Sequence, residues 1–337
     1  MAVSFWRGRP TLVTGATGLM GSWLLRRLID EGADVVALVR DGAPKSIAVD
    51  EGWIDRIATV HGSLSDFDLL RRTLAEYSID TIFHLAAQPL VGVAKLDPLS
   101  TLETNVRGTW NVLESARLCG TRQMVLASSD KAYGPSSDLP YKETHRLQGI
   151  YPYDVSKSCA DLIAGMYATT YSLPVVVARC ANLYGGGDYH FSRTIPGVIQ
   201  ATIKGERFVV RSDGKFVRDF LYVKDAAAAY MRLAEALAGN RALTGECFNF
   251  GLGLRLTVLE LVAKVLEMMG RTDLEPVVLN QASTEIREQY LSSEKAREKL
   301  GWSPQHSLED GLRETIEWYA DRLASGGVRV ERATVVD

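Results

Sequence analysis

The chain has 337 residues, of which 46% are apolar and 23% are charged, and its formal net charge is −3. This length allows a large core and suggests about two domains. The slightly acidic balance argues against a nucleic acid partner, and no apolar run approaches the roughly 18 residues of a membrane span. Residues 1–10 lack the apolar stretch of a secretory signal, and the cysteines (Cys119, Cys159, Cys180 and Cys247) show no metal or disulfide spacing. We therefore expect a cytoplasmic protein with free thiols, no bound metal and no membrane contact.

Strand and helix patterns alternate through the first half of the chain. Apolar runs predict strands at 11–14, 34–39, 59–61, 81–85, 123–128 and 175–179. Amphipathic stretches between them predict helices at 22–31, 67–77, 102–118 and 153–171. This alternation predicts an α/β fold with a doubly wound parallel sheet over residues 1–184.

The alternation ends after Tyr184, where three glycines follow one another at 185–187. Helices are predicted at 195–204, 223–238 and 257–269 in a more mixed pattern. We expect residues 185–325 to form a smaller mixed α/β lid that mainly binds the substrate. Residues 326–337 form a tail, either a late strand or disordered.

A glycine-rich turn follows the first predicted strand, with glycines at every third position. Without side chains, such a turn lets a pyrophosphate approach the backbone and the N–H groups that begin the next helix. The turn therefore predicts a dinucleotide site and makes the sheet a Rossmann-type one. Its predicted cofactor contacts are Gly15, Thr17, Gly18, Leu19, Met20 and Gly21.

The end of the second strand normally selects between NAD and NADP. An acidic residue there binds the ribose 2′-hydroxyl, whereas an arginine accommodates a 2′-phosphate. The chain has Val39-Arg40-Asp41, so the acid is absent or displaced by two residues. Arg40 could bind a 2′-phosphate, stack on adenine, or form a solvated pair with Asp41, and both cofactors stay open.

Two further motifs predict acid–base chemistry. Tyr153 and Lys157 lie four residues apart on one face of a predicted helix, and an ammonium beside a phenol lowers the pKa of the phenol. Tyr153 could then take a proton from a hydroxyl group. Ser128-Ser129-Asp130-Lys131 ends a strand at the sheet edge where such folds bind ligands. The predicted catalytic residues are Ser129, Asp130, Lys131, Tyr153 and Lys157.

These motifs resemble those of the extended short-chain dehydrogenase/reductase family, in particular its nucleoside-diphosphate-sugar epimerases and 4,6-dehydratases. The resemblance runs from about Thr11 to Trp302. Its motifs are the glycine turn, His84-Leu85-Ala86-Ala87, Thr104-Asn105-Val106, Ser129, Tyr153 with Lys157, Arg218-Asp219-Phe220 and Leu300-Gly301-Trp302. The stretches His84–Val91, Ser129–Tyr133 and Gly185–Asp188 look most like CDP-glucose 4,6-dehydratases.

The resemblance implies roles for further residues. Around the dinucleotide they are Ser63 and Leu64 beside adenine, Leu85, Ala86 and Ala87 along the cofactor, Asn105 near the nicotinamide ribose, and Ser128, Tyr153 and Lys157. For the substrate they are Gln88, Asn182, Arg193, Arg218 and Arg287, since an arginine fork matches phosphate oxygens. The alternatives are ion pairs of Arg218 with Asp219 and of Arg287 with its glutamate neighbours.

The chain departs from its relatives in two places. Most 4,6-dehydratases of the family have Asp-Glu where this chain has Asp130-Lys131, although the CDP-glucose group has Asp-Lys. The Val-Arg-Asp stretch is similar to NADP-using GDP-mannose dehydratases instead. Arg40 thus favours NADP, whereas the most similar group favours NAD.

The implied reaction is a 4,6-dehydration with a tightly held NAD(P). Tyr153 removes the proton of the sugar 4-hydroxyl as hydride leaves C4, and Lys131, or a water it positions, removes the C5 proton. Protonated Asp130 then helps the 6-hydroxyl to leave, and hydride returns to C6. A 4-epimerase would use Tyr153, Lys157 and Ser129 alone, and a non-catalytic dinucleotide-binding regulator is a further alternative.

Two predicted helices carry more apolar residues than one sheet-facing stripe needs. These residues are Val106, Trp110, Leu113, Leu162, Ile163 and Met166. The resemblance implies a homodimer joined by a four-helix bundle. The alternative is that the extra residues pack beneath the lid.

Overall fold

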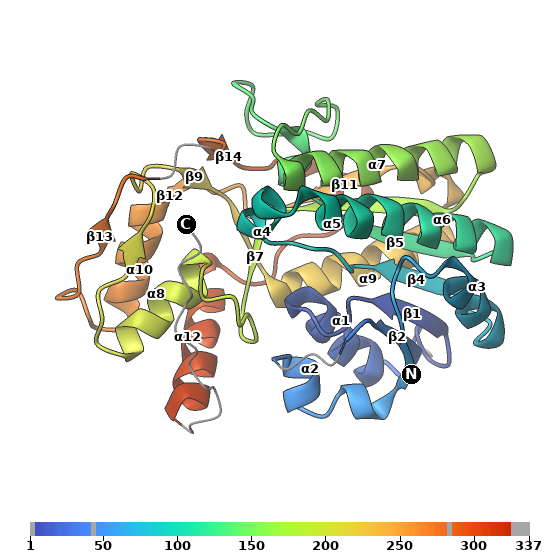
Figure 1. The fold of residues 1–337 in the computed structure, drawn as a ribbon, viewed down its shortest axis with the longest axis horizontal. Coiled ribbons are helices and arrows are strands. Elements are labelled where there is room, and N and C mark those ends of the chain that lie inside the picture. The colour runs from blue at the N-terminus through green and yellow to red at the C-terminus, as the bar shows by residue number, and fades with distance from the viewer. Residues whose placement is uncertain (1–3, 42–44, 282–284, 325–337) are drawn as a thin grey trace.

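The computed structural model describes residues 4–41, 45–281 and 285–324. Within these ranges the chain forms a larger α/β part and a smaller lid beside it (Figure 1). The larger part contains a seven-stranded parallel sheet with the order β11-β6-β5-β4-β1-β2-β3. Its strands are β1 (Pro10–Thr14), β2 (Asp34–Val39), β3 (Ala58–His61), β4 (Thr81–His84), β5 (Gln123–Ser129), β6 (Val175–Cys180) and β11 (Cys247–Phe250). The predicted doubly wound sheet is confirmed.

Helices cover both faces of this sheet (Figure 1). One layer contains α3 (Phe67–Glu76), α6 (Gly108–Cys119) and α7 (Pro152–Tyr171), and the other contains α1 (Leu19–Asp30) and α9 (Val223–Gly239). Successive residues of β2 alternate between the layers: Val35 and Ala37 pack on the α1 side, and Val36 and Leu38 on the α3 side. Strand β2 is continuously apolar over Val35–Val39 because both of its faces are buried.

The helix predicted at 102–118 is divided into three segments. They are α5 (Pro98–Leu102), the π-helical turn η2 (Glu103–Arg107) and α6, and the shorter α4 (Val91–Leu96) precedes them. The side chain of Asp97 accepts the backbone N–H of Ser100 and thereby starts α5. The other predicted elements of the first half agree with the structure within three residues at their ends.

The larger part also includes elements from beyond residue 184. Helix α9 packs beneath the sheet, β11 pairs with β6 as the edge strand, and α11 (Glu294–Leu300) packs on α9 and β11. The larger part therefore does not end at residue 184.

The remaining short segments are α2 (Ile47–Asp50) and the 3-10 turns η1 (Ile54–Arg56), η3 (Asp130–Tyr133) and η4 (Arg241–Leu243).

The lid is a mixed α/β structure of short strand pairs and helices. Its strands are β7 (Asn182–Tyr184), β8 (Val209–Val210), β9 (Val217–Arg218), β10 (Phe220–Tyr222), β12 (Leu256–Thr257), β13 (Val277–Val278) and β14 (Glu288–Gln289). Its helices are α8 (Thr194–Ile203), α10 (Val258–Met268) and α12 (Leu308–Ala324). A separate apolar core joins the three helices, with Ile199, Val262 and Leu312 fully buried. The predicted tail, 326–337, lies outside the described residues.

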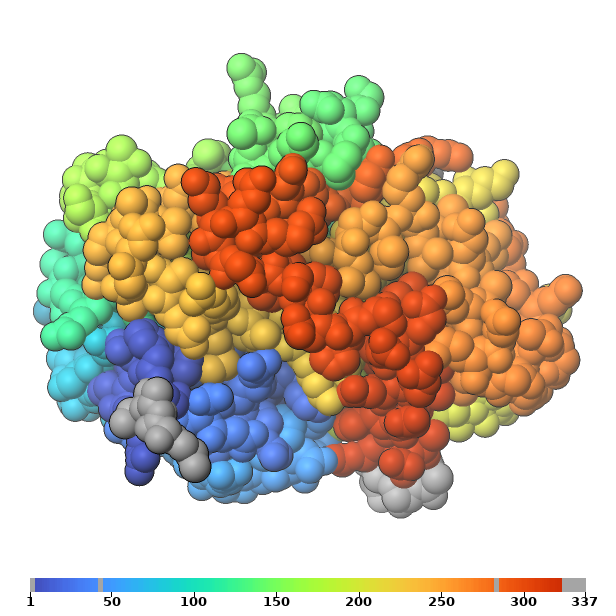
Figure 2. Space-filling view, turned by 180° about the vertical axis from the view of Figure 1, so that it is seen from behind, coloured from blue at the N-terminus to red at the C-terminus, as the bar shows by residue number. Residues whose placement is uncertain are grey.

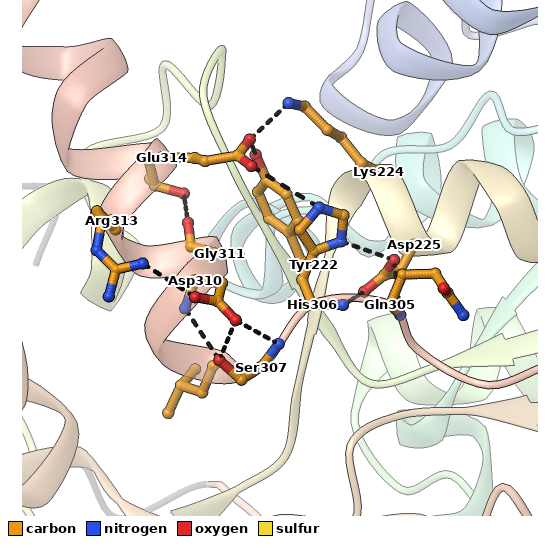
Figure 3. Close-up of polar contacts among 12 residues, drawn as sticks. Tyr222, Lys224, Asp225, Gln305, His306, Ser307, Asp310, Gly311, Arg313 and Glu314 are labelled. Atoms are coloured by element: carbon orange, nitrogen blue, oxygen red, sulfur yellow. Dashed lines mark hydrogen bonds and ion pairs between the residues drawn. The ribbon is translucent and has the colours of Figure 1, made fainter.

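Polar contacts fix α12 to the rest of the molecule (Figure 3). The carboxylate of Asp225, which is 2% exposed, accepts the N–H groups of Gln305 and His306 at 3.2 and 3.1 Å and lies 2.9 Å from His306 Nδ1. Glu314 of α12 accepts a hydrogen bond from Lys224 at 2.5 Å. At its other end α12 lies against the segment after α2, where Arg322 pairs with Glu51 (Figure 2). No described helix has both the length and the apolar content of a membrane span.

Candidate active site

The glycine turn lies between β1 and α1, at the carboxyl edge of the sheet. Gly15 has a φ of +76°, and a Cβ atom there would lie 2.7 Å from the backbone nitrogen of Ala86. A Cβ at Gly21 would lie 2.0 Å from the carbonyl oxygen of Gly15. Gly18 has more room, since a Cβ would meet only the Gly15 oxygen, at 3.4 Å. Gly15 and Gly21 thus pack the turn, and Gly18 leaves its outer face open to a pyrophosphate.

Helix α1 begins beside this open face. In the described structure no side chain caps its first turn, and its N-cap residue is Gly18. The N–H groups there are suited to bind phosphate oxygens. Thr17, Leu19 and Met20 are partly buried around the turn. The predicted cofactor residues of the turn are thus brought together in a shape that fits a dinucleotide.

A buried chain of hydrogen bonds fixes the neighbouring segment, Leu85–Ala87. Thr14 Oγ1 accepts the N–H groups of Leu85 and Ala86, both at 3.2 Å, and lies 2.8 Å from His84 Nδ1. The other ring nitrogen of His84 lies 3.1 Å from Thr109 Oγ1. Burial lowers the pKa of His84 to about 3, so the ring is a neutral link. No sequence motif points to either threonine.

Asn105 and Gln88 are engaged within the protein. Asn105, which is 2% exposed in the π-helical turn, accepts the N–H of Gln88 at 2.7 Å and donates to Ser156 Oγ at 2.9 Å. The Gln88 side chain donates to Leu90 O and Thr101 Oγ1, both at 3.1 Å. These contacts tie the loop after β4 to α7, and π-helical turns often occur at functional sites. The predicted ligand contacts of both residues stay predictions.

Candidate adenine contacts follow β2 and β3, which are neighbours in the sheet. Ser63 is partly buried, and Leu64 is buried with its carbonyl held by Asn111 Nδ2 at 2.8 Å. Arg40 is 68% exposed, and its Nε lies 2.6 Å from Asp41 Oδ2. The solvated pair is thus the arrangement observed for Arg40, and its guanidinium is exposed enough to meet a 2′-phosphate as well.

The predicted catalytic pair lies at the start of α7. Tyr153 and Lys157 are 9% and 6% exposed, and Lys157 Nζ donates to the carbonyl of Ala127 at 2.9 Å. Burial lowers the pKa of Lys157 to about 8. The expected lowering of the Tyr153 pKa is wrong for this structure: burial raises it, although the Arg193 charge and a hydrogen bond with Ser129 oppose the rise. Desolvation of the phenolate outweighs the nearby positive charge.

Polar groups after β5 complete the cluster. Asp130, which is 1% exposed, accepts a hydrogen bond from Ser129 Oγ at 3.0 Å through Oδ1. Its Oδ2 atom and Ser128 Oγ are buried without a hydrogen-bond partner among the described residues. Such atoms are normally satisfied, so both fit a site that a ligand completes. The described residues contain no group of three or more side chains suited to a metal.

Two buried residues near this cluster, Gln289 and Asp154, were not predicted from the sequence. Lys131 Nζ donates to Gln289 Oε1 of lid strand β14 at 2.9 Å. Asp154 is 3% exposed, and burial raises its pKa to about 6 against the opposing charge of Lys131. Asp154 could have been found inside the Tyr153–Lys157 motif. Gln289 lies in a two-residue strand without any recognisable pattern.

Arg218 does not pair with Asp219, the alternative that the sequence suggested. Arg218 is 8% exposed, and its guanidinium lies 3.0 Å from Glu285 Oε2. The fully buried Asp219 instead accepts the backbone N–H groups of four residues, Phe220, Gly253, Leu254 and Leu291. Burial raises the pKa of Asp219 to about 6. Asp219 therefore shapes the backbone, and Arg218 lies beside a half-exposed carboxylate.

The other predicted substrate residues lie on separate lid segments. Arg193, before α8, pairs with Asp188 at 2.9 Å. Arg287 is 67% exposed and lies 3.5 Å from Asp213, and not beside the glutamates next to it in the sequence. Asn182 Nδ2 donates to the Asp219 carbonyl at 3.0 Å. Both arginines thus have a carboxylate partner within the lid.

The comparisons with known proteins agree with this geometry. The family model described as GDP-mannose 4,6 dehydratase matches residues 12–315. The CDP-glucose 4,6-dehydratase of Salmonella typhimurium is 30% identical over 94% of this chain and 92% of its own. The UDP-glucose 4-epimerase of Mycolicibacterium smegmatis is 33% identical over 93% of this chain and 99% of its own.

A solved structure with a similar fold is the dTDP-glucose 4,6-dehydratase of Streptomyces venezuelae with NAD bound. It has a TM-score of 0.85 and 31% identity, and the match covers 94% of this chain and 98% of that one. The UDP-glucose 4-epimerase of Thermotoga maritima with UDP-glucose has a TM-score of 0.84 and 29% identity, covering 93% and 99%. The chain therefore belongs to the GDP-mannose 4,6 dehydratase family of extended short-chain dehydrogenase/reductases.

Proposed function

We propose that the chain is a nucleoside-diphosphate-sugar 4,6-dehydratase that forms a 4-keto-6-deoxy sugar, with a CDP-glucose-like substrate. The observation that supports this proposal is that Asp130 accepts a hydrogen bond from Ser129 and interacts with Tyr153 through its charge, while Lys131 follows Asp130 in the chain. Oxidation at C4 needs only the tyrosine, its lysine and the serine. Elimination also needs an acid for the departing hydroxyl and a base for the C5 proton, and this chain has both side chains there.

We infer that the larger part holds a nicotinamide dinucleotide tightly. The turn around Gly18, the α1 N-terminus and the unpartnered Ser128 hydroxyl fit its phosphates and its ring end. When bound, this group would supply hydride acceptance from C4 and hydride return to C6. Similar solved structures hold NAD, whereas Arg40 favours NADP, so the choice between them is part of the test.

The chain's own residues divide the proton transfers among them. Tyr153 takes the 4-hydroxyl proton while Ser129 holds the same oxygen. Because burial raises the pKa of Tyr153, this step depends on the groups that stabilise the phenolate, namely Arg193 and Ser129. Asp130 gives its proton to the departing 6-hydroxyl, and Lys131 receives the C5 proton.

The lid arginines would bind the diphosphate of the sugar nucleotide. Arg218 is held in place by the backbone carbonyl of Val217 at 2.9 Å, while its charge partner Glu285 is 49% exposed. A diphosphate can replace this carboxylate because it offers the same bidentate oxygen geometry with more charge. Arg193, Arg287 and Asn182 would contribute from their own segments.

The test is to supply a panel of nucleotide-activated glucoses in deuterated water, with NAD and with NADP. We expect a 4-keto-6-deoxy product that carries deuterium at C5, with the CDP sugar as the best donor. A 4-keto-6-deoxy product without label at C5 would contradict the scheme. The same panel identifies the donor base and the cofactor.

A 4-epimerase is the second candidate, because similar relatives with this fold include 4-epimerases. It would leave Asp130 and Lys131 without a chemical task. A product that keeps its 6-hydroxyl and is inverted at C4 would decide for it. A non-catalytic regulator would turn over none of the donors and would lose nothing on changing Tyr153 to Phe.

We further infer a cytoplasmic homodimer joined by helices α6 and α7. Trp110, Leu162 and Met166 are 43%, 61% and 45% exposed on these helices. Leu113, in contrast, is fully buried in the core between the sheet and the layer of α3, α6 and α7, and is wrong as an interface residue. Leu96 of α4 and Leu99 of α5 are also exposed, at 63% and 70%. Sedimentation at micromolar concentration should show a dimer, and a monomer alone would contradict the inference.

A further inference from the structure

A lid residue contacts the elimination cluster directly. Gln289 lies in β14, which pairs in parallel with β9 so that Gln289 is opposite Arg218. Its carbonyl accepts the N–H of Asp219 at 3.1 Å, and the next residue, Tyr290, accepts the N–H of Tyr141 at 3.0 Å. The backbone of Gln289 is therefore fixed from both sides, by the lid and by the loop after β5.

Strand alternation points the Gln289 side chain inward. Its neighbour Glu288 faces solvent, where it meets Arg255 at 3.3 Å, whereas Gln289 has no exposed surface. The amide oxygen, Oε1, accepts a hydrogen bond from Lys131 Nζ at 2.9 Å. The orientation of the amide is dictated, because an ammonium has only donors and needs an acceptor opposite it.

The partner of Lys131 is neutral, and this matters for its task. One buried carboxylate, that of Asp154, already interacts with Lys131 through its charge, and Asp154 is 3% exposed. An acceptor carboxylate at position 289 would add a direct ion pair and favour the charged ammonium. An amide instead fixes the direction of the lysine side chain with one hydrogen bond and adds no net charge.

We propose that Gln289 is a positioning residue for elimination, which aims Lys131 through a neutral hydrogen bond while leaving the amine able to accept a proton. This inference rests on the proposed function. In the step, the neutral amine takes the C5 proton, the C5–H electron pair forms the C5=C6 double bond, and the C6–O bond breaks. The oxygen leaves as water with the proton of Asp130.

Two variants separate the effect of Gln289 on the orientation of Lys131 from the effect of a charge at position 289. Gln289→Leu keeps the volume and removes the acceptor, and Gln289→Glu keeps an acceptor and adds a charge. Gln123→Leu is the matched control, because Gln123 is a buried glutamine at the far end of β5, 1% exposed and bonded to Thr81. It reports what the loss of a buried glutamine does to stability without touching Lys131.

The first measurement is rapid mixing of the cofactor-loaded protein with the best donor. In Gln289→Leu we expect C4 oxidation, seen as the transient reduced nicotinamide, to stay within about twofold, while loss of water slows by roughly tenfold to a hundredfold. Reduced cofactor then accumulates. In Gln289→Glu the elimination rate should recover as the pH rises, because the added charge favours the ammonium. Equal slowing of both steps, or slowing equal to that of Gln123→Leu, overturns the inference.

The second measurement needs no turnover. The protein is labelled with ¹³Cε-lysine, and the Lys131 signal, assigned with Lys131→Met, is titrated in each variant. We expect its titration to move to higher pH in Gln289→Glu and to lower pH in Gln289→Leu. If the wild-type product keeps its 6-hydroxyl, the proposed function fails. The titration still shows whether Gln289 contacts Lys131. An identical Lys131 titration in all variants overturns the inference.

Discussion

Different interactions stabilise the proposed dinucleotide side and the proposed substrate side of the site. On the dinucleotide side, glycine backbone packs within contact distance and a neutral chain from Thr14 through His84 to Thr109 fixes the adjoining segment. On the substrate side, Arg218 lies against Glu285, with similar pairs for the other lid arginines. Backbone packing and neutral hydrogen bonds shape the first region. In the second region the arginines are paired with carboxylates of the lid, and under the proposed function the phosphates of the ligand would replace these carboxylates.

The largest effect is expected where the two regions meet, at Tyr153. Changing Tyr153 to Phe removes the proton acceptor for the 4-hydroxyl, and turnover should fall by at least about 10³-fold. Dinucleotide affinity should change little, since the ring stays in place. The readout is kcat beside cofactor titration, with Tyr77→Phe, an exposed tyrosine, as the control. Substantial activity in Tyr153→Phe would remove the proposed chemistry.

A steric change should damage only the dinucleotide side. In Gly21→Ala the new methyl group would lie 2.0 Å from the Gly15 carbonyl, so the turn must open. We expect a loss of stability of about 3 kcal/mol and a dinucleotide affinity reduced more than tenfold. Denaturant unfolding and fluorescence titration measure both. Gly239→Ala, with nothing within 4 Å of the new atom, should be neutral, and equal effects would break the steric argument.

The buried amine of Lys157 should reveal itself in the pH dependence of stability. Its pKa falls from 10.5 to about 8 on folding, which corresponds to about 3 kcal/mol. A lowered pKa means that the folded state resists protonation, so the charge destabilises the fold below about pH 8 and ceases to do so by about pH 10.5. Lys157→Met should therefore gain most in stability over the wild type near pH 7. A pH-independent difference between the two proteins would contradict this.

Exchange of carboxylate for phosphate can be tested on one ion pair. Arg218→Ala should raise the KM for the sugar nucleotide roughly tenfold to a hundredfold, as for a lost charge-assisted hydrogen bond. Glu285→Gln removes the internal competitor and should lower the KM a few-fold. Neither change should alter dinucleotide affinity. If Glu285→Gln instead raises the KM, Glu285 supports the site and does not compete for it.

The smallest effect concerns the cofactor's 2′ group. Arg40 is exposed and paired with Asp41, so its charge is largely screened. Arg40→Ala should weaken NADP binding by about tenfold and leave NAD binding unchanged, as measured by parallel calorimetric titrations. If both cofactors bind equally well in the variant and in the wild type, Arg40 makes no contact with that group.

The two regions also differ in how far the sequence predicts them. Glycine spacing and apolar runs are local, so the turn, the sheet and the Tyr153–Lys157 helix could be read directly from the sequence. Strand β11 could not, because its four residues become a strand only by pairing with β6, which ends 67 positions earlier, at Cys180. The π-helical turn likewise contains Asn105, which bonds to Gln88 and Ser156, both distant in sequence.

Partner choice among charges was the least predictable property. Sequence neighbours suggested Asp219 for Arg218, yet Asp219 is buried among backbone N–H groups, and Glu285 meets the arginine from another lid segment. Asp213 reaches Arg287 in the same way. Long, flexible side chains pair with whichever charges lie near them in the folded structure, and no local sequence pattern encodes this. The lysine partner Gln289 was missed for the same reason.

The late arrival of β11 has a consequence for synthesis. Until residues 247–250 leave the ribosome, β6 is an edge strand whose backbone N–H and C=O groups on one side lack their partners. The nascent chain must therefore carry an open, apolar sheet edge while the first part of the lid is translated. A gene fragment cut at residue 184 would make that state permanent, and self-association through β6 is the expected fate of such a fragment.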